Sequence, residues 1–370
     1  MKSYTTKIGN PITPARNLAM LRLLSLFSVG ALLHTVLAGM AIAAESSAAP
    51  QQIARYVAID NVCAWPQLAV LRDGTIAAIL HNQPAHGLRE GDVECWTSAN
   101  GEFWSKAGTP TQHEPNTIRM NHAAGLAKNG DLIVLCSGWT NEQQPGRPKQ
   151  KPFRDATLRP LVCRSSDGGR TWTRSTEFPV AEKSQFIPFG PIAAGEDGVL
   201  HASCYANRSA WHFRSNDDGR TWQPTAVIAP GYNETSLLRL GGKRWLAAAR
   251  LESTDLFRSD DDGATWQGPQ PVTGRSELNG HLARLKDGRL LLSYGNRVKG
   301  QYGVMAKLSS DEGKSWSEPI RLAHTLSGDC GYPSSVQRAD GKIVTAYYAK
   351  SAENHHRYHM GVAIWEPPAR

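Results

Sequence analysis

Six segments of the chain share one hydrophobic pattern: an apolar run, a tight polar turn containing glycine, and a second apolar run. They begin at Leu68, Gly125, Pro191, Leu237, Leu282 and Val336. Turns of the Asp-Gly or Gly-Gly type between two apolar runs are typical of β-hairpins, because glycine adopts the positive φ that tight turns require. The pattern therefore predicts six β-hairpins, and repetition of this kind indicates a fold built from repeated units.

A second pattern alternates with the hairpins and has the form Ser-x-Asp-x-Gly-x-Thr/Ser-Trp. Intact copies are SSDGGRTW at Ser165, SNDDGRTW at Ser215, SDDDGATW at Ser259 and SSDEGKSW at Ser309, and a degenerate copy, TSANGEFW, begins at Thr97. The intact copies start 50, 44 and 50 residues apart, a spacing that fits one four-stranded unit with its connections. Asp and Ser side chains that cap backbone amides, a left-handed Gly and a packing Trp indicate a structural turn. Too few carboxylates are present in each copy for a calcium site.

Together the two patterns predict an all-β fold, a six-bladed β-propeller of four-stranded antiparallel blades, forming a single domain over residues 45–370. The sixth hairpin is followed by HHRYHMGVAIWEPP without a box. We expect the early strand from Ile53 to Ile59 to complete this last blade and close the ring. The segment from Trp139 to Arg159 interrupts the spacing. It is interpreted as a surface loop or as a flap over a pocket.

The first 44 residues predict an export signal. Four basic and no acidic residues precede or begin an apolar run from Leu23 to Ala43 that ends in small residues. An uncleaved membrane anchor is the alternative, because the run is nearly long enough to span a bilayer. With cleavage we expect a periplasmic or secreted protein without membrane association, whose formal net charge falls from +8 to about +4. That mild charge, without a dense basic stripe, argues against nucleic acid as a partner.

Six cysteines follow this segment, and none is spaced as Cys-x-x-Cys. Disulfide bonds and buried free thiols both remain open, and zinc and thioredoxin-like sites are disfavoured. His355, His356 and His359 are interpreted as part of a solvated turn. No metal and no other cofactor is expected, and the sequence does not indicate an oligomeric state.

The repeated boxes resemble those of the sialidase (neuraminidase) superfamily, the Asp-box or BNR-repeat propellers, and the resemblance covers nearly the whole chain after the export segment. It is specific for the fold and less specific for function, because related propellers act on other sugars or catalyse nothing. Sialidases use a tyrosine nucleophile activated by a glutamate, an aspartate as general acid/base, and three arginines that bind the substrate carboxylate.

The resemblance carries over to particular residues. YNETSLLRLGGKRWLAAAR looks like the family's Glu-to-Arg stretch, which implies Glu234 and Arg250. DCGYPSSVQ looks like the nucleophile strand and implies Tyr332, and Asp92 lies in the loop where the family keeps its acid/base. The family's first arginine is absent, because Ala64-Trp65-Pro66 stands at its position. Arg297 is the candidate for the third, and Gln301 is the alternative residue at that position.

In such a propeller, residues just before each hairpin face a central funnel. These residues are Trp65, Arg119, His122, Glu234, His281, Asp329 and Tyr332. Arg89, Asp92, Arg250 and Arg297 end neighbouring strands or lie in adjoining loops. We expect Tyr332, Glu234 and Asp92 to be catalytic. The substrate is expected to contact Arg250, Arg297, Arg89, Arg119, Trp65, His122 and His281.

Carboxylates, arginines, imidazoles and a tyrosine converging on one site suit an anionic sugar, and three functions fit them. The first is a sialidase-like exo-glycosidase acting on terminal sialic acid or a related acidic sugar. The second is a lyase acting on uronate polymers, with His122 or His281 as base and Tyr332 as acid, or a rhamnosidase-type enzyme. The third is a glycan-binding propeller without catalysis. An arginine in place of Trp65 would have favoured the first.

Overall fold

The structure is a computed structural model, and it describes residues 52–142, 145–146, 151–181 and 185–370. The predicted export segment, residues 1–44, lies outside the described residues. Within the described ranges the chain forms strands, turns and loops, and it contains no helix with the length and apolar character needed to cross a membrane.

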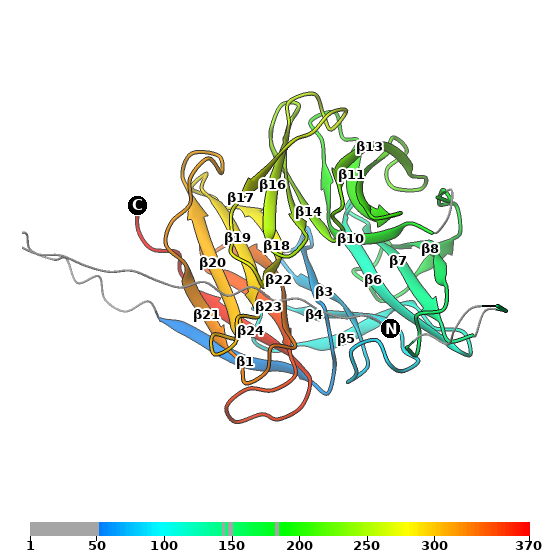
Figure 1. The fold of residues 1–370 in the computed structure, drawn as a ribbon, viewed down its shortest axis with the longest axis horizontal. Helices are drawn as coiled ribbons and strands as arrows, with labels where there is room; N and C mark the ends of the chain where they lie inside the picture. Colours follow the sequence, from blue (N-terminus) through cyan, green and yellow to red (C-terminus); the bar gives the residue numbers. More distant parts are fainter. Residues whose placement is uncertain (1–51, 143–144, 147–150, 182–184) are drawn as a thin grey trace, which may run out of the picture. The chain divides into compact units, whose positions relative to one another are not determined.

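The strands follow one another in antiparallel runs of four (Figure 1). The first run consists of β2 (Gln67–Val70), β3 (Ile76–His81), β4 (Val93–Ser98) and β5 (Ser105–Thr111). The second consists of β6 (Thr117–Leu126), β7 (Leu132–Thr140), β8 (Thr157–Ser165) and β9 (Thr173–Ser175). The third consists of β10 (Ile187–Ala194), β11 (Leu200–Ala206), β12 (Ser209–Ser215) and β13 (Gln223–Pro230).

Three further runs complete the sequence of strands. They are β14 (Thr235–Gly241), β15 (Arg244–Arg250), β16 (Thr254–Ser259) and β17 (Gln267–Pro271); then β18 (Glu277–Arg284), β19 (Leu290–Asn296), β20 (Gly303–Ser309) and β21 (Ile320–His324); and finally β22 (Cys330–Gln337), β23 (Ile343–Ala349), β24 (His359–Trp365) and β1 (Ile53–Asp60). A short parallel pairing of β10 with β6 joins the second and third runs into one eight-stranded sheet.

All six predicted hairpins are confirmed, because the two apolar halves of each pattern pair as antiparallel neighbours. The prediction that the early strand completes the last unit is also confirmed. Strand β1 pairs with β24 from Ile53 opposite Trp365 to Asp60 opposite His359, so sequence-distant strands share one sheet. The first strand of each run contacts the first strand of the next, and β22 contacts β2.

The Ser-x-Asp-x-Gly-x-Thr-Trp boxes are turns held by their own side chains. In the copy at Ser259, the Ser259 hydroxyl accepts the Gly263 amide at 2.8 Å. Asp261 accepts the Thr265 amide at 2.8 Å and the Thr265 hydroxyl at 2.6 Å. The Trp266 indole donates to the Gly263 carbonyl at 3.1 Å. The boxes therefore satisfy the backbone of the turn between the third and fourth strands of a run.

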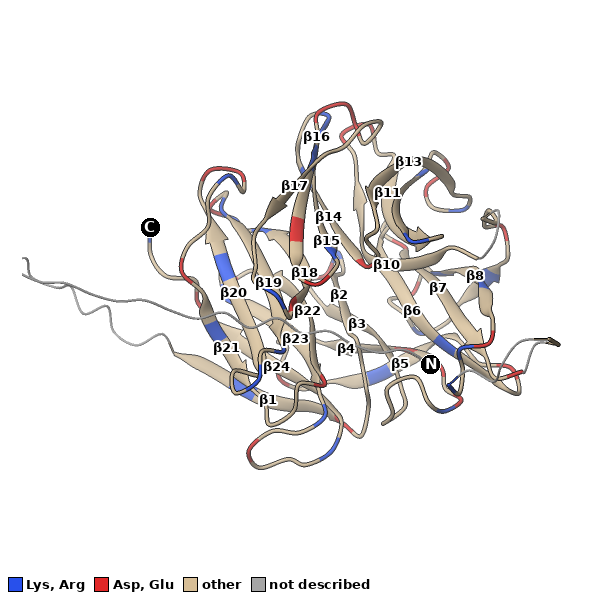
Figure 2. Cartoon of the chain, viewed as in Figure 1, with Lys and Arg blue, Asp and Glu red and all other residues tan. Residues whose placement is uncertain are grey.

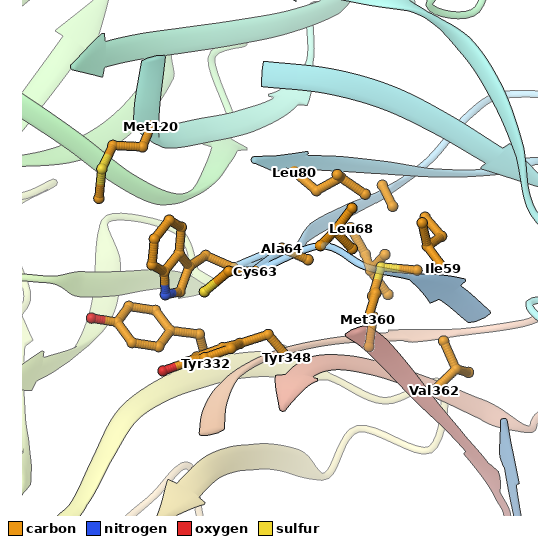
Figure 3. Close-up of a cluster of buried hydrophobic side chains, with 14 of the residues drawn as sticks. Ile59, Cys63, Ala64, Leu68, Leu80, Met120, Tyr332, Tyr348, Met360 and Val362 are labelled. Atoms are coloured by element: carbon orange, nitrogen blue, oxygen red, sulfur yellow. The ribbon is translucent and has the colours of Figure 1, made fainter. Parts of the chain in front are cut away.

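The hydrophobic core is divided into clusters of buried side chains. Figure 3 shows one of them, which includes Leu68, Leu80 and Met360 together with Tyr332 and Tyr348. All six cysteines are buried and none forms a disulfide. The sequence left disulfide bonds and buried free thiols open, and the structure has buried free thiols. Figure 2 shows basic and acidic residues in the loops and on some strands of the described chain.

Candidate active site

Residues with a left-handed backbone recur where the first strand of a run begins or bulges. They are Trp65 (φ 44°), Asn121 (60°), Gly190 (83°), Asn279 (59°) and Tyr332 (48°). Four of the five lie where the pairing register of β6, β10, β18 or β22 shifts, and Trp65 precedes β2. All five line one cavity of about 220 Å³. Bulges re-aim side chains, so the repeat turns one residue from each of these strands into the same cavity.

Two of these positions carry aromatic side chains. A bulky residue at positive φ is strained by roughly 1–3 kcal/mol, and such strain concentrates at functional sites. The rings of Trp65 and Tyr332 meet edge to face, with centroids 6.3 Å apart. The core thus fixes both rings at the cavity wall.

Tyr332, Glu234 and Arg250 form a closed hydrogen-bonded triangle. The Tyr332 hydroxyl lies 2.8 and 2.9 Å from the two carboxylate oxygens of Glu234. It accepts a hydrogen bond from Arg250 Nη1 at 2.9 Å. The same Nη1 also forms an ion pair with Glu234. The phenol proton therefore points to a carboxylate while a cation faces the phenol oxygen.

The charges around the phenol act in opposite directions. Burial and the Glu234 carboxylate raise the pKa of Tyr332 above its ordinary range, and the guanidinium groups of Arg250 and Arg297 lower it. The Glu234 carboxylate raises the pKa of Arg250, which stays charged. Phenolate formation at rest is disfavoured, so the proton leaves only as the oxygen engages an electrophile.

The hairpin of β14 and β15 explains how two of these groups meet. Thr235 pairs with Ala249, so Glu234 and Arg250 stand opposite each other one position further along. Asn279 then fixes the carboxylate from the neighbouring run, because its side-chain amide donates to Glu234 Oε2 at 2.7 Å. Asn279 is buried and left-handed, a conformation that Asn tolerates better than most residues.

A second group of polar side chains, formed by His86 and Asp329, lies next to Trp65. His86, in the loop after β3, places Nδ1 2.7 Å from Asp329 Oδ1. Asp329 also accepts the hydroxyl of Tyr348 at 2.7 Å and that of Tyr358. Figure 3 shows the hydroxyls of Tyr332 and Tyr348 pointing in the same direction, and their ring centroids are 5.8 Å apart. His86 lines the cavity, whereas Asp329 lies behind it.

Arg154 brings a further cation to the cavity wall from the 139–159 insertion. Its Nη1 donates to the Gly87 carbonyl at 3.2 Å, and its guanidinium lies 5.3 Å from the centroid of the Trp139 ring. Burial lowers the pKa of Arg154. Among the described residues no carboxylate pairs with it, so its charge is available to a ligand.

The predicted site residues therefore separate into two groups. Trp65, His122, Glu234, Arg250, His281 and Tyr332 line the cavity. Arg297 lies behind it, with its guanidinium 5.6 Å from the centroid of the Tyr332 ring and Nε on the Cys330 carbonyl.

Three predicted residues lie apart from the cavity lining. The Asp92 carboxylate accepts both the amide of His113 at 2.9 Å and its Nδ1 at 2.6 Å. Arg119 is buried and bonds Glu114 at 2.9 and 3.1 Å. Arg89 is exposed.

The two predicted histidines are held by the fold. His122 Nε2 bonds the Ile79 carbonyl at 2.9 Å, and His281 Nδ1 accepts the Ser335 amide at 3.3 Å. Burial lowers the pKa of each to about 4, so both are neutral at physiological pH. No cluster of metal-binding side chains is present within the described ranges.

Sequence reasoning missed Asn279, His86 and Arg154 as site residues. Asn279 and His86 carry no motif, and Arg154 lies in a segment interpreted as a surface loop or a flap, without any residue of it being singled out. The sequence did contain one signal for the recurring left-handed positions. The left-handed residue is followed by proline in Trp65-Pro66, Gly190-Pro191 and Tyr332-Pro333, each just before a hairpin.

Comparison with known proteins places the chain among repeat proteins of this kind. The sequence model of the BNR repeat-like domain matches residues 74–345. The fold is similar to that of a protein of unknown function from Dyadobacter fermentans, with a TM-score of 0.73 and 22% identity over 85% of this chain and 99% of that chain. No protein of curated function matches the sequence.

Sialidase structures share the fold as well. The Hadza microbial sialidase Hz136 has a TM-score of 0.65 and 16% identity over 83% of this chain and 66% of its own. The NanB sialidase from Streptococcus pneumoniae has a TM-score of 0.65 and 12% identity over 86% of this chain and 70% of its own. At these identities the likeness concerns the fold.

Proposed function

The chain belongs to the BNR repeat-like domain family, and from that premise we propose that it is a sialidase-like exo-glycosidase that hydrolyses terminal sialic acid or a related acidic sugar from glycans. One observation carries the proposal. The Tyr332 hydroxyl is hydrogen-bonded to both Glu234 carboxylate oxygens and to Arg250 at the wall of a cavity. A nucleophile within hydrogen-bond reach of a base that a third group orients is the arrangement of covalent catalysis.

The reaction proceeds in two displacements. Glu234 takes the phenol proton as the Tyr332 oxygen bonds to the anomeric carbon, and the glycosidic carbon–oxygen bond breaks as the departing oxygen takes up a proton. Water then attacks the same carbon and gives up a proton, the tyrosyl–sugar bond breaks, and Glu234 returns the phenol proton to Tyr332. A neutral phenol suits an anionic sugar, because it approaches the anomeric centre without the repulsion that a carboxylate nucleophile would meet.

Selectivity for an acidic sugar rests on the cations of the cavity. Arg250 shares its charge with Glu234, whereas Arg154 has only carbonyl oxygens and an aromatic face as partners among the described residues. A guanidinium without a paired carboxylate binds a substrate carboxylate through charge-assisted hydrogen bonds. Arg154 thus takes the role of the family's first arginine, which is absent because Trp65 stands at its position. Trp65 in turn offers a ring for stacking on the sugar.

We also propose an arrangement of the blades and a cellular location for the protein. The six four-stranded runs are arranged as propeller blades around the cavity. The contacts between successive first strands, and between β22 and β2, support this arrangement. The domain spans residues 45–370, and the protein is exported by residues 1–44 to the periplasm or beyond the cell, where its partner is an acidic glycan.

The lyase interpretation receives less support from the site. It requires His122 or His281 as a base with an available lone pair. Both ring nitrogens of His281 already have partners. His122 Nε2 donates to the Ile79 carbonyl, so its lone pair lies on Nδ1, an atom that is buried away from solvent. The geometry supports the hydrolase best, and the experiment below keeps the lyase as an outcome.

Two assays on the purified protein test the proposal. One follows a fluorogenic aryl glycoside of N-acetylneuraminic acid, and the other follows ultraviolet absorbance from unsaturated uronate on acidic polysaccharides. We expect fluorophore release that is lost in Tyr332→Phe. It should be retained in Tyr294→Phe, a buried tyrosine outside the cavity. A rise in absorbance without fluorophore release would contradict the proposal, and so would binding of the sugar without turnover.

A further inference from the structure

The cavity contains a nucleophile and its base, but the reaction also needs a proton donor for the departing oxygen. Among the described residues that line the cavity, Glu234 is the one carboxylate. It is occupied by Tyr332, Arg250 and Asn279. The predicted donor, Asp92, is not part of the lining, and its carboxylate is bound by His113. The proton must come from another titratable group.

Tyr205 also lines the cavity, but burial raises the pKa of its phenol well above the ordinary range. Among the described histidines of the lining, His86 is the one that is not buried. Its ring lines the cavity and its side chain is 37% exposed, so substrate and water reach it. Nδ1 bonds Asp329, and within the described ranges Nε2 has no hydrogen-bond partner. By contrast, His122 and His281 are buried, and each bonds the backbone through one ring nitrogen.

Asp329 fixes which nitrogen of His86 exchanges the proton. Although burial acts against it, hydrogen bonds from His86 and Tyr358 hold the pKa of the Asp329 carboxyl below its ordinary range. As a carboxylate it only accepts hydrogen bonds, so it keeps a proton on Nδ1 and leaves Nε2 to donate or accept. The hydroxyls of Tyr348 and Tyr358 hold the carboxylate in place.

The position of His86 relative to the nucleophile is set by shared aromatic neighbours. Trp65 contacts the His86 ring at 5.1 Å and the Tyr332 ring at 6.3 Å between centroids. Tyr348 contacts the same two rings at 6.0 and 5.8 Å. His86 and Tyr332 thus pack against the same two aromatic side chains.

We propose that His86, oriented by Asp329, is the general acid/base of this site, an inference that rests on the proposed hydrolase function. In the first displacement, His86 Nε2–H gives its proton to the glycosidic oxygen as that oxygen leaves the anomeric carbon. In the second, the neutral Nε2 takes a proton from the attacking water as Tyr332 departs. His86 is then restored to its protonated form.

Several charged and titratable groups surround the His86 ring. Asp329 faces Nδ1, with Tyr348 of β23 and Tyr358 behind it. Arg154 donates to the carbonyl of the adjacent Gly87, and Arg297 donates to the Tyr348 hydroxyl at 3.0 Å. Asp329 is thus a positioning residue that holds Nδ1 of the His86 ring.

The test compares two leaving groups in His86→Ala. An aryl glycoside of N-acetylneuraminic acid departs as a stabilised phenolate and needs little protonation, whereas a sialyl-lactose departs as an alkoxide and needs it fully. We expect kcat/KM to fall about 10²–10⁴-fold with sialyl-lactose and less than about 10-fold with the aryl glycoside. His113→Ala is the matched control, a histidine on a carboxylate outside the cavity, and we expect it to change neither.

The positioning role has its own readout. Asp329→Asn removes the negative charge beside Nδ1 while keeping the size of the side chain. We expect kcat/KM to fall more for sialyl-lactose than for the aryl glycoside, because Nδ1 loses the carboxylate that holds Nε2 toward the departing oxygen. His86→Gln measured alongside shows whether any loss follows the proton or the shape of the side chain.

The outcomes separate this inference from the function on which it rests. If the unaltered protein fails to hydrolyse the aryl glycoside, the hydrolase proposal fails. If it hydrolyses both substrates and His86→Ala slows both equally or neither, the hydrolase stands and the role of His86 is wrong. A loss confined to sialyl-lactose in Asp92→Asn would assign the proton to Asp92 instead. Unchanged thermal unfolding of His86→Ala excludes misfolding as the cause.

Discussion

The hydroxyl of Tyr332 bonds both carboxylate oxygens of Glu234 at 2.8 and 2.9 Å, although the two residues stand 98 positions apart. Glu234 directly precedes the fourth run of strands, and Tyr332 sits in a bulge of the sixth. Neither hairpin alone creates the pair, because the fifth run separates them in the chain and its first strand, β18, contacts both β14 and β22. The chemistry of the site therefore depends on the assembly of the repeats.

Replacement of the base tests this pair. Glu234→Gln keeps the size of the side chain and removes the group that accepts the phenol proton. We expect kcat to fall about 10²–10⁴-fold, with a smaller change in KM, measured by steady-state kinetics on the aryl glycoside. Glu94→Gln alters another buried carboxylate, away from the cavity, and should leave kcat unchanged. Equal kcat in Glu234→Gln and the unaltered protein would rule out its role as base.

Arg154 is expected to bind the acidic group of the substrate. Arg154→Ala removes a charged donor from the cavity wall, so we expect KM for the acidic sugar to rise about 10- to 100-fold with little change in kcat. Lys151→Ala removes an exposed cation from the same insertion and serves as the control. If both variants raise KM alike, general electrostatic attraction explains the effect and Arg154 makes no specific contact.

Gly87 is expected to matter through Arg154. A Cβ at this residue would lie 2.8 Å from Arg154 Nη2, and its φ of +64° disfavours any side chain. We therefore expect Gly87→Ala to raise KM in the same direction as Arg154→Ala. Gly74→Ala imposes similar backbone strain at φ +88° with no atom within 4 Å of the added carbon. A normal KM in Gly87→Ala would show that Arg154 does not need its observed position.

Buried histidines are expected to make the fold sensitive to acid. Burial lowers the pKa of His281 to about 4, below the value of about 6.5 in an unfolded chain. Between these values the unfolded state binds the proton and the folded state does not, so the free energy of unfolding falls as pH decreases. For one such imidazole the loss from pH 7 to pH 5 is about 2 kcal/mol.

Urea unfolding of His281→Gln at both pH values measures this contribution. The variant should lose about 2 kcal/mol less than the unaltered protein between pH 7 and pH 5. His324→Gln, at an exposed position, should retain the full loss. An identical pH dependence in all three proteins would contradict a neutral buried His281.

Much of the fold was predictable because its signals are local. Each hairpin contains its own glycine turn and apolar halves, and the boxes close on their own side chains. The opposition of Glu234 and Arg250 also follows from one hairpin. The resemblance in sequence then pointed to Tyr332.

The rest of the site depends on contacts between distant segments. The sequence shows His86 only as a loop residue. Its proposed role depends on its hydrogen bond to Asp329, 243 positions away. Asn279 joins the site because its left-handed backbone aims its side chain at Glu234 from the neighbouring run. Asp92 illustrates the converse, since a residue in a plausible loop turned instead to His113. Tertiary packing rather than local pattern decides these roles.

The most direct test of the account is capture of the covalent intermediate on Tyr332. A sialosyl fluoride with a second fluorine beside the anomeric carbon slows both displacements, and its good leaving group lets the first proceed. Mass spectrometry of the digested protein should then find the fluorinated sugar on the peptide that contains Tyr332, and no adduct in Tyr332→Phe. An adduct on another residue, or turnover of the reagent without any adduct, would contradict Tyr332 as the nucleophile.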